Sequence, residues 1–165
     1  MVSRMPRTRS GTDDERATLV RAGNAIEQLG THAIDLVDDD AAAYDEVVSA
    51  YRQPKATDGE KASRREAVDA ALRGAAEVPL EVMRTCRAGL TEAVEIARCG
   101  NRAAGSDVGV AVELLTAALR GAALNVRTNL DAMSDVGYVD GVRAEVDRLG
   151  TSAIELAADA RKSPA

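Results

Sequence analysis

The chain has 165 residues, of which 45% are hydrophobic, and carries a formal net charge of −6. This length suits one domain with a core. The negative charge argues against nucleic acid or an anionic membrane as the principal ligand, because both require a positive face. Phe and Trp are absent, and small side chains on long segments with only four Pro favour closely packed helices. We therefore predict an all-α bundle of about four to five long helices.

A core of Ala and Val buries less apolar area per residue than one of Phe and Leu, so we expect the chain to need a partner surface and to form an oligomer. Residues 1–12 mix Arg, Ser, Pro and Gly without periodicity and are predicted to be a disordered tail before a single helical domain at 13–162. The chain shows no secretory signal and no apolar run that could span a membrane, so a cytoplasmic location is expected. Cys86 and Cys99 lack metal-ligand spacing, and His32 is the only histidine, so no metal site is predicted.

The first helix is predicted to run from Asp13 to Tyr51, with Thr12 as its N-cap. One face of this helix carries side chains spaced three or four residues apart, namely Ile26, Leu29, Ala33, Leu36, Asp40, Tyr44, Val47 and Tyr51. Asp40 lies at the centre of this face and is therefore predicted to be buried. A carboxylate that loses hydration suits general acid–base catalysis, which makes Asp40 the best catalytic candidate. An ion pair with an Arg, or a cap on a neighbouring helix, would explain the same position.

The second helix is predicted to follow a break at residues 53–60, where Thr57 and Glu60 form a capping box, and to continue to about residue 99. Pro79 removes a backbone donor, so a kink or a helix break is expected there. Arg52 and Lys55 lie at the end of the first helix and could hold an anionic ligand tail. Solvation and a favourable charge at the helix C-terminus are the alternative.

Gly100 and Asn101 tolerate the left-handed conformation and predict the end of the second helix. The third helix is predicted at residues 106–133, with Asn125 and Asn129 on a face of small residues. These amides could bind a ligand or form a hydrogen bond between helices. The last helix is predicted to follow residue 135. Its apolar seam consists of Val139, Val142, Val146, Leu149, Ala153, Leu156 and Ala160.

Several strings occur in one order over about residues 15–155: DDDAAAY at 38–44, AYRQPK at 50–55, AAEVPL at 75–80, CGN at 99–101, SDVGVA at 106–111 and RGAALNV at 120–126. Together they resemble the formiminotransferase-cyclodeaminase family, specifically its cyclodeaminase/methenyltetrahydrofolate cyclohydrolase domain. The resemblance implies an all-helical homodimer without metal or cofactor. Its substrate would be a one-carbon derivative of tetrahydrofolate. The reaction would be either loss of ammonia from 5-formiminotetrahydrofolate or addition of water to methenyltetrahydrofolate.

The family's catalytic aspartate lies in a D-x-D-A-x-A-Y segment, which assigns that role to Asp40, with Asp38 as second choice. The resemblance further implies a pocket shaped by four polar residues, Asn101, Asp107, Asn125 and Asn129. Arg52 or Lys55 would meet the glutamate tail of the folate.

Family members also carry a P-G-G-G-S segment before an Ala-rich helix, and this sequence has neither. A start codon assigned too far downstream, replacement by a partner chain, and a degenerate paralogue are three competing explanations. The alternative functions are a non-catalytic helical dimerisation or folate-binding protein and a generic four-helix interaction module.

Overall fold

The computed structural model describes residues 2–4 and 12–162. Its long elements are four α-helices, α1 (Asp13–Tyr51), α2 (Asp58–Cys99), α3 (Gly105–Leu130) and α4 (Val136–Lys162). Two short 3₁₀ turns, η1 (Val2–Arg4) and η2 (Arg102–Ala104), complete the described structure, which contains no strand in these ranges. The predicted all-α class and the expected number of long helices are confirmed.

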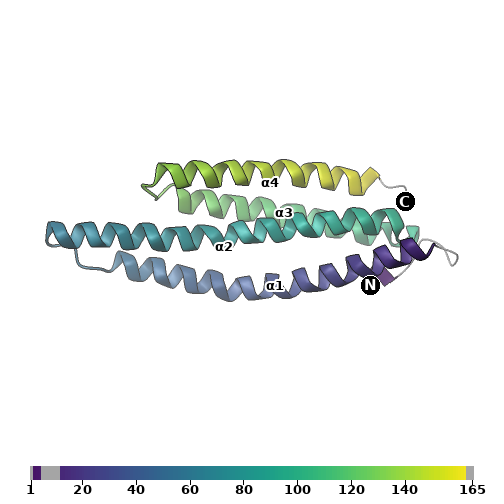
Figure 1. Cartoon of the computed structure of the whole chain (residues 1–165), viewed down its shortest axis with the longest axis horizontal. Coiled ribbons are helices and arrows are strands. Elements are labelled where there is room, and N and C mark those ends of the chain that lie inside the picture. The colour runs from purple at the N-terminus through teal and green to yellow at the C-terminus, as the bar shows by residue number, and fades with distance from the viewer. Residues whose placement is uncertain (1, 5–11, 163–165) are drawn as a thin grey trace.

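Helix α2 is the central element of the bundle. It packs against α1 on one side and against both α3 and α4 on the other. Figure 1 shows that α1 and α2 form a long antiparallel hairpin, whose connection extends beyond the shorter α3 and α4. The main core gathers buried side chains of α2, α3 and α4, including Leu80, Met83, Leu90, Val126 and Val146.

Both long helices begin with the capping chemistry that the sequence predicts. Thr12 and Thr57 each accept a hydrogen bond from the backbone N–H of the glutamate three residues later, and that glutamate accepts from the backbone of the capping threonine. The hydrogen bond from the Thr57 backbone lowers the pKa of Glu60. These reciprocal bonds satisfy N–H groups that have no partner inside the helix.

The buried stripe of α1 differs from the predicted one. Its buried residues are Leu19, Ala22, Leu36, Ala43 and Ala50, so the stripe largely follows a seven-residue spacing. Asp40 is exposed, and the prediction that it is buried is wrong. At 100° per residue, Asp40 lies about 40° from Leu36 and Tyr44 about 80°. The predicted face therefore turns away from α2 at these positions, and Asp40 stands at the edge of the helix contact.

Helix α2 continues through Pro79, so the predicted alternative of a helix break there is wrong. Gly100 ends this helix as predicted, although with φ −76° and ψ 173° rather than in the left-handed region. A Cβ atom at Gly100 would lie 2.5 Å from the carbonyl oxygen of Ile96. Steric room therefore explains the glycine at this position.

The predicted tail at 1–12 lies mostly outside the described residues, since residues 1 and 5–11 are not described. Residues Val2–Arg4 form η1, which packs against α1. A Cβ atom built on Gly23 would lie only 2.7 Å from Oγ of Ser3. The close approach of η1 to α1 therefore depends on a glycine at position 23.

Candidate functional site

A groove runs between α1 and α3, with α2 as its floor, and has a volume of about 400 Å³. Its floor is formed by Val78, Pro79 and Val82. Its walls are formed on α1 by Ala33, Leu36, Val37 and Asp40, and on α3 by Ala118, Gly121, Ala122 and Asn125. The groove is therefore mostly apolar, with one carboxylate and one carboxamide in its walls.

The groove stays open because small side chains line α3. A Cβ atom built on Gly121 would meet no heavy atom within 4 Å. Both α1 and α3 pack extensively on α2, whereas they have little direct contact with each other. Space therefore remains above Pro79, because Gly121 has no side chain and Ala118 and Ala122 each carry only a methyl group. A larger residue at these positions would fill it.

Asp40 and Asn125 bring polar groups to opposite walls of this groove. Both residues are exposed, and within the described ranges Asp40 has no hydrogen bond or ion pair to another residue. The sequence-based alternative, an Asp40–Arg ion pair, is therefore not observed among residues 2–4 and 12–162. Both groups are free to contact a ligand, and a carboxylate facing an amide across apolar walls can bind a heterocycle with polar edges.

Asn129 lies one turn further along α3 and binds the backbone of α2. Its Nδ2 donates to the carbonyl oxygen of Ala75 at 2.8 Å and makes a longer contact of 3.4 Å with Oδ1 of Asn125. Of the two roles considered for these amides, the hydrogen bond between helices is thus observed for Asn129. Asn125 remains available to the groove.

The structure does not bring Asn101 and Asp107 to the groove that Asp40 lines. Asn101 caps η2 by accepting from the N–H of Ala103 at 2.9 Å, and it lines a separate cavity of about 210 Å³. Asp107 is exposed in the first turn of α3. Along one helix, Asp107 and Asn125 are separated by about 27 Å.

Arg52 and Lys55 lie near the α1–α2 connection. Arg52 is about 18 Å from Asp40 along the axis of α1. Lys55 lines a basic cleft of about 480 Å³ together with Lys61, Arg64 and Arg65. Arg64 donates to the carbonyl oxygen of Tyr51 at 3.1 Å, which fixes one side of this cleft. Arg52 is exposed and caps α1 through its backbone.

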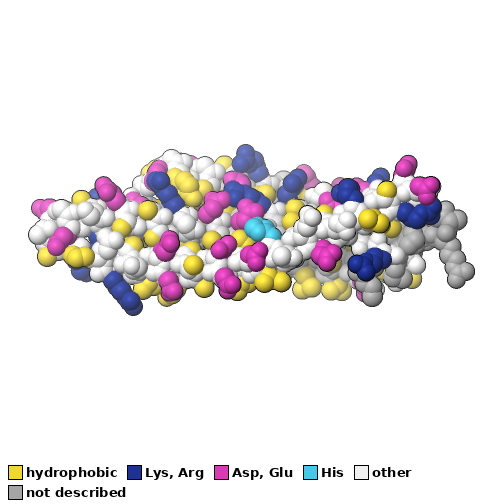
Figure 2. Space-filling model, turned by 60° about the horizontal axis from the view of Figure 1, so that its bottom comes forward, with side chains coloured by type: hydrophobic (Ala, Val, Ile, Leu, Met, Phe, Trp, Pro, Cys, Tyr) yellow, Lys and Arg dark blue, Asp and Glu magenta, His cyan; other side chains and the backbone are white. Residues whose placement is uncertain are grey.

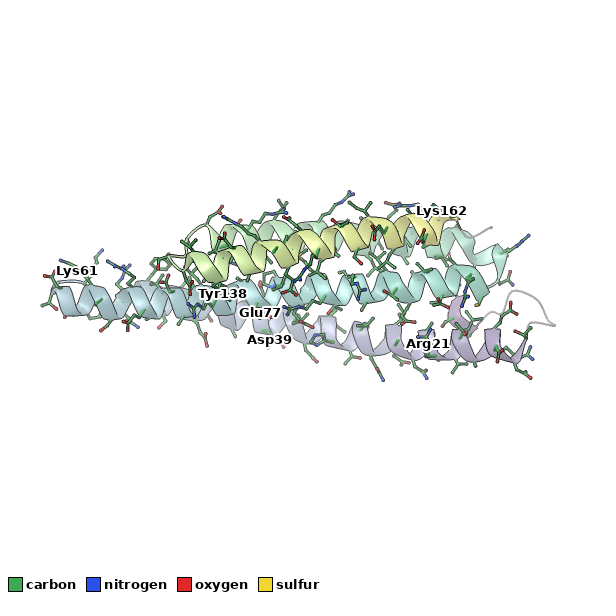
Figure 3. The ribbon with its side chains drawn as sticks, turned by 45° about the horizontal axis from the view of Figure 1, so that its top comes forward. Arg21, Asp39, Lys61, Glu77, Tyr138 and Lys162 are labelled. Atoms are coloured by element: carbon green, nitrogen blue, oxygen red, sulfur yellow. The ribbon has the colours of Figure 1, made fainter. Side chains whose placement is uncertain are left out.

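Asp38, the second choice for the catalytic residue, is exposed and does not line the groove. Asp39 does not line the groove either and lies on the outer side of α1 (Figure 3).

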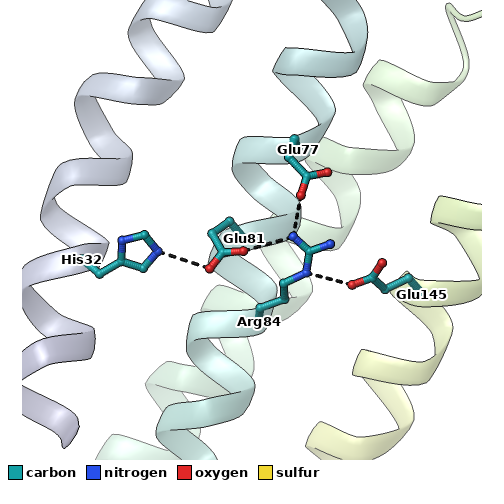
Figure 4. A network of polar contacts seen from close by, with 5 residues as sticks. All are labelled: His32, Glu77, Glu81, Arg84 and Glu145. Atoms are coloured by element: carbon teal, nitrogen blue, oxygen red, sulfur yellow. Dashed lines mark hydrogen bonds and ion pairs between the residues drawn. The ribbon is translucent and has the colours of Figure 1, made fainter.

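A polar network that the sequence reasoning missed lies on a different face of α2 (Figure 4). Arg84 donates through Nε to Glu145 of α4 at 2.8 Å, and through Nη1 to Glu81 at 3.0 Å and to Glu77. Nε2 of His32 on α1 lies 3.2 Å from the other oxygen of Glu81. Figure 2 shows the histidine with acidic side chains beside it, about midway along the molecule. In the sequence, the spacing of Glu77, Glu81 and Arg84 indicates part of this network, because side chains three or four residues apart are neighbours on a helix.

Within the described ranges, no group of three or more His, Cys, Asp and Glu side chains is arranged to hold a metal ion. In the same ranges, no helix has the length and apolar character needed to cross a membrane.

Comparison with known proteins shows a family match. The family model for formiminotransferase-cyclodeaminase matches residues 1–148. The chain is 40% identical over 114 residues to a methenyltetrahydrofolate cyclohydrolase of Methylorubrum extorquens, covering 69% of this chain and 55% of the relative. It is 33% identical to the formimidoyltransferase-cyclodeaminase of Sus scrofa over 133 residues, covering 81% of this chain and 25% of the relative. The chain thus spans about half of the bacterial relative and a quarter of the mammalian one.

The fold agrees with these matches. The crystal structure of formiminotetrahydrofolate cyclodeaminase from Thermotoga maritima superposes with a TM-score of 0.86 at 26% identity, covering 99% of this chain and 77% of that chain. On the family model and the relatives together, the chain belongs to the formiminotransferase-cyclodeaminase family.

Proposed function

We propose that this chain is an enzyme of folate one-carbon metabolism, acting as a formiminotetrahydrofolate cyclodeaminase or a methenyltetrahydrofolate cyclohydrolase. The observation that carries the proposal is the groove in which Asp40 and Asn125 face an apolar floor from opposite walls. Its volume of about 400 Å³ suits part of a small-molecule ligand. The substrate is a tetrahydrofolate derivative, and the proposal requires no further cofactor.

Asp40 is the proton-transferring group in this proposal. In the cyclohydrolase reaction, water adds to the methenyl carbon between two ring nitrogens, and a carboxylate takes up the proton that the water loses. The resulting tetrahedral carbon then breaks its bond to one nitrogen, which needs a proton to leave. In the cyclodeaminase reaction the second folate nitrogen attacks the formimino carbon and gives up its proton, and the bond to the departing nitrogen breaks as that nitrogen takes up a proton and leaves as ammonia. One carboxylate beside the reacting carbon can accept and return a proton in either reaction, so Asp40 fits both.

Asn125 orients the ligand in this proposal, and the basic cleft supplies the anion-binding end. Lys55, with Lys61, Arg64 and Arg65 beside it, offers positive charge for the carboxylates of a glutamate tail. Arg52 lies at the same end of the hairpin. Asn101 and Asp107 lie toward the opposite end of α3 from Asn125, so this proposal gives them no contact with the ligand in the groove.

The decisive experiment follows the absorbance of methenyltetrahydrofolate with the wild-type protein, Asp40→Asn and Asp39→Asn. Removal of a general base lowers turnover by about 10²- to 10⁴-fold, so Asp40→Asn should lose nearly all activity. Asp39 is exposed outside the groove and provides the matched control with wild-type turnover. Ammonia release from formiminotetrahydrofolate, measured in parallel, separates the two reactions.

Three other outcomes contradict different parts of the proposal. Full activity of Asp40→Asn would remove Asp40 from the mechanism. Folate binding by a folded protein without turnover would support a folate-binding paralogue. A folded protein that binds no folate would support an interaction module.

We also propose a homodimer in the cytoplasm. Ile34 of α1 is 71% exposed and Val37 is 67% exposed, which is apolar surface that a second copy could cover. Two buried free thiols, Cys86 and Cys99, fit a reducing compartment. Analytical ultracentrifugation tests the dimer: Ile34→Glu should produce a monomer, whereas Ile154→Glu on α4, at a position 60% exposed, should not. A wild-type monomer at micromolar concentration would contradict it.

A further inference from the structure

Pro79 leaves one carbonyl group of α2 without its helical hydrogen bond. In an α-helix, the carbonyl oxygen of residue 75 would accept from the backbone N–H of residue 79, and proline has none. The side chain of Asn129 replaces that donor, because its Nδ2 lies 2.8 Å from the oxygen of Ala75. A proline on the groove floor is thus coupled to a side chain on the neighbouring helix.

This bond fixes the orientation of the Asn129 amide. A carbonyl oxygen can only accept, so the NH₂ group of Asn129 must face Ala75. The same Nδ2 lies 3.4 Å from Oδ1 of Asn125, which can accept the second hydrogen. With its oxygen turned toward Asn129, Asn125 has its own NH₂ group left for the groove that it lines.

We infer that Asn129 is a positioning residue, which orders Asn125 so that α3 presents hydrogen-bond donors to the ligand. The inference rests on the proposed function, in which this groove holds the folate. Asp40 on the opposite wall is an acceptor when ionised. The groove therefore selects a heterocycle that places a carbonyl oxygen or an unprotonated ring nitrogen against α3 and a proton-bearing group against α1.

Thermal unfolding tests the link between Pro79 and Asn129 without any ligand. Asn129→Ala leaves the Ala75 carbonyl unpaired and should lower Tm by about 2–8 °C. In a Pro79→Ala background, residue 79 supplies the missing N–H, so the same substitution should lower Tm by less than half as much. Thr128→Ala is the matched control, because Thr128 Oγ1 donates to Leu124 at 3.0 Å, a carbonyl that also has its helical donor. Equal losses in both backgrounds would overturn the link.

Calorimetric titration with 5-formyltetrahydrofolate tests the orientation of Asn125. We expect Asn125→Ala to weaken binding about tenfold, and Asn129→Ala to weaken it measurably but by no more than that factor. In the Asn125→Ala background, Asn129→Ala should cause no further loss, because Asn129 acts through Asn125. Asn125→Asp should bind worse than Asn125→Ala, since it turns a donor into a charged acceptor.

If the role of Asn129 is purely structural, Asn129→Ala should weaken binding equally in the wild-type and Asn125→Ala backgrounds, or in neither. Either result would overturn the inference. Wild-type affinity of Asn125→Asp would also overturn it, because no donor would then be needed. If the wild-type protein binds no folate, the proposed function fails together with the ligand part of the inference. The Tm comparison then decides the Pro79–Asn129 link independently.

Discussion

Arg84 of α2 donates a hydrogen bond through Nε to Oε1 of Glu145 on α4, at 2.8 Å. This bond is the main cause of the lowered pKa of Glu145 and of the raised pKa of Arg84. Because Arg84 also binds Glu81, and Glu81 contacts His32, the network connects α4 through α2 to α1. The three helices are thus joined by polar contacts at a position away from the groove.

Glu145→Gln should lower stability at neutral pH by about 1 kcal/mol, since the pair is partly exposed. A carboxyl group whose pKa is lower in the folded state stabilises the protein above its unfolded pKa of about 4.3. This contribution disappears as the pH falls through the folded pKa. Urea unfolding should therefore show a difference from wild type at pH 7 that shrinks as the pH falls below about 4.3. Glu155→Gln, an exposed position on the same helix, should show none across this pH range.

Thr85→Val should stabilise the protein by about 1 kcal/mol. Thr85 is 8% exposed, and its Oγ1 is buried with no hydrogen-bond partner among the described residues. Replacing this hydroxyl with a methyl group removes the cost of an unsatisfied polar atom. Thr116→Val is the matched comparison, because Thr116 is also buried but donates to the carbonyl oxygen of Val112 at 2.7 Å. A gain in Tm at position 116 as large as that at 85 would contradict this explanation.

Gly121→Leu should fill the groove while the helix remains intact. No heavy atom lies within 4 Å of a Cβ at this position, so α3 accepts the side chain, and its helix propensity adds about 0.5–1 kcal/mol of stability. Folate titration should show at least about a tenfold loss of affinity, because the leucine occupies ligand space. Gly141→Leu provides the control, since position 141 on α4 is equally open but does not line the groove. Unchanged folate binding by Gly121→Leu would place the site elsewhere.

The two thiols should react slowly in the folded protein. Cys86 and Cys99 are both buried, and burial raises the pKa of the Cys86 thiol. Less thiolate and less access both slow attack on a disulfide reagent. We expect native labelling to be at least about a hundredfold slower than labelling in guanidinium. The two positions are separated by about 20 Å along α2, too far for a disulfide within the chain. Rapid labelling of the native protein would show that this part of α2 opens.

Local sequence chemistry determined where α1 and α2 begin and most of the apolar seam of α4. Thr12 and Thr57 cap helices because their partners lie three residues away in the chain. The predicted seam of α4 faces the core: Val139, Val142, Val146, Ala153 and Ala160 are buried, and Leu149 and Leu156 are partly buried. Ala157, which is also buried, was not part of the prediction. Periodicity also placed Asn125 and Asn129 on one face of α3, and the contact between them agrees with this.

Tertiary structure alone decided how the helices rotate against one another and what their polar groups meet. Asp40 was predicted to be buried, but α1 contacts α2 along a seven-residue stripe that leaves Asp40 at its edge. Pro79 was visible in the sequence, whereas its replacement donor, Asn129, lies 50 residues further along the chain. Which side chain reaches an unpaired carbonyl depends on the packing of two helices, and no local pattern contains that register.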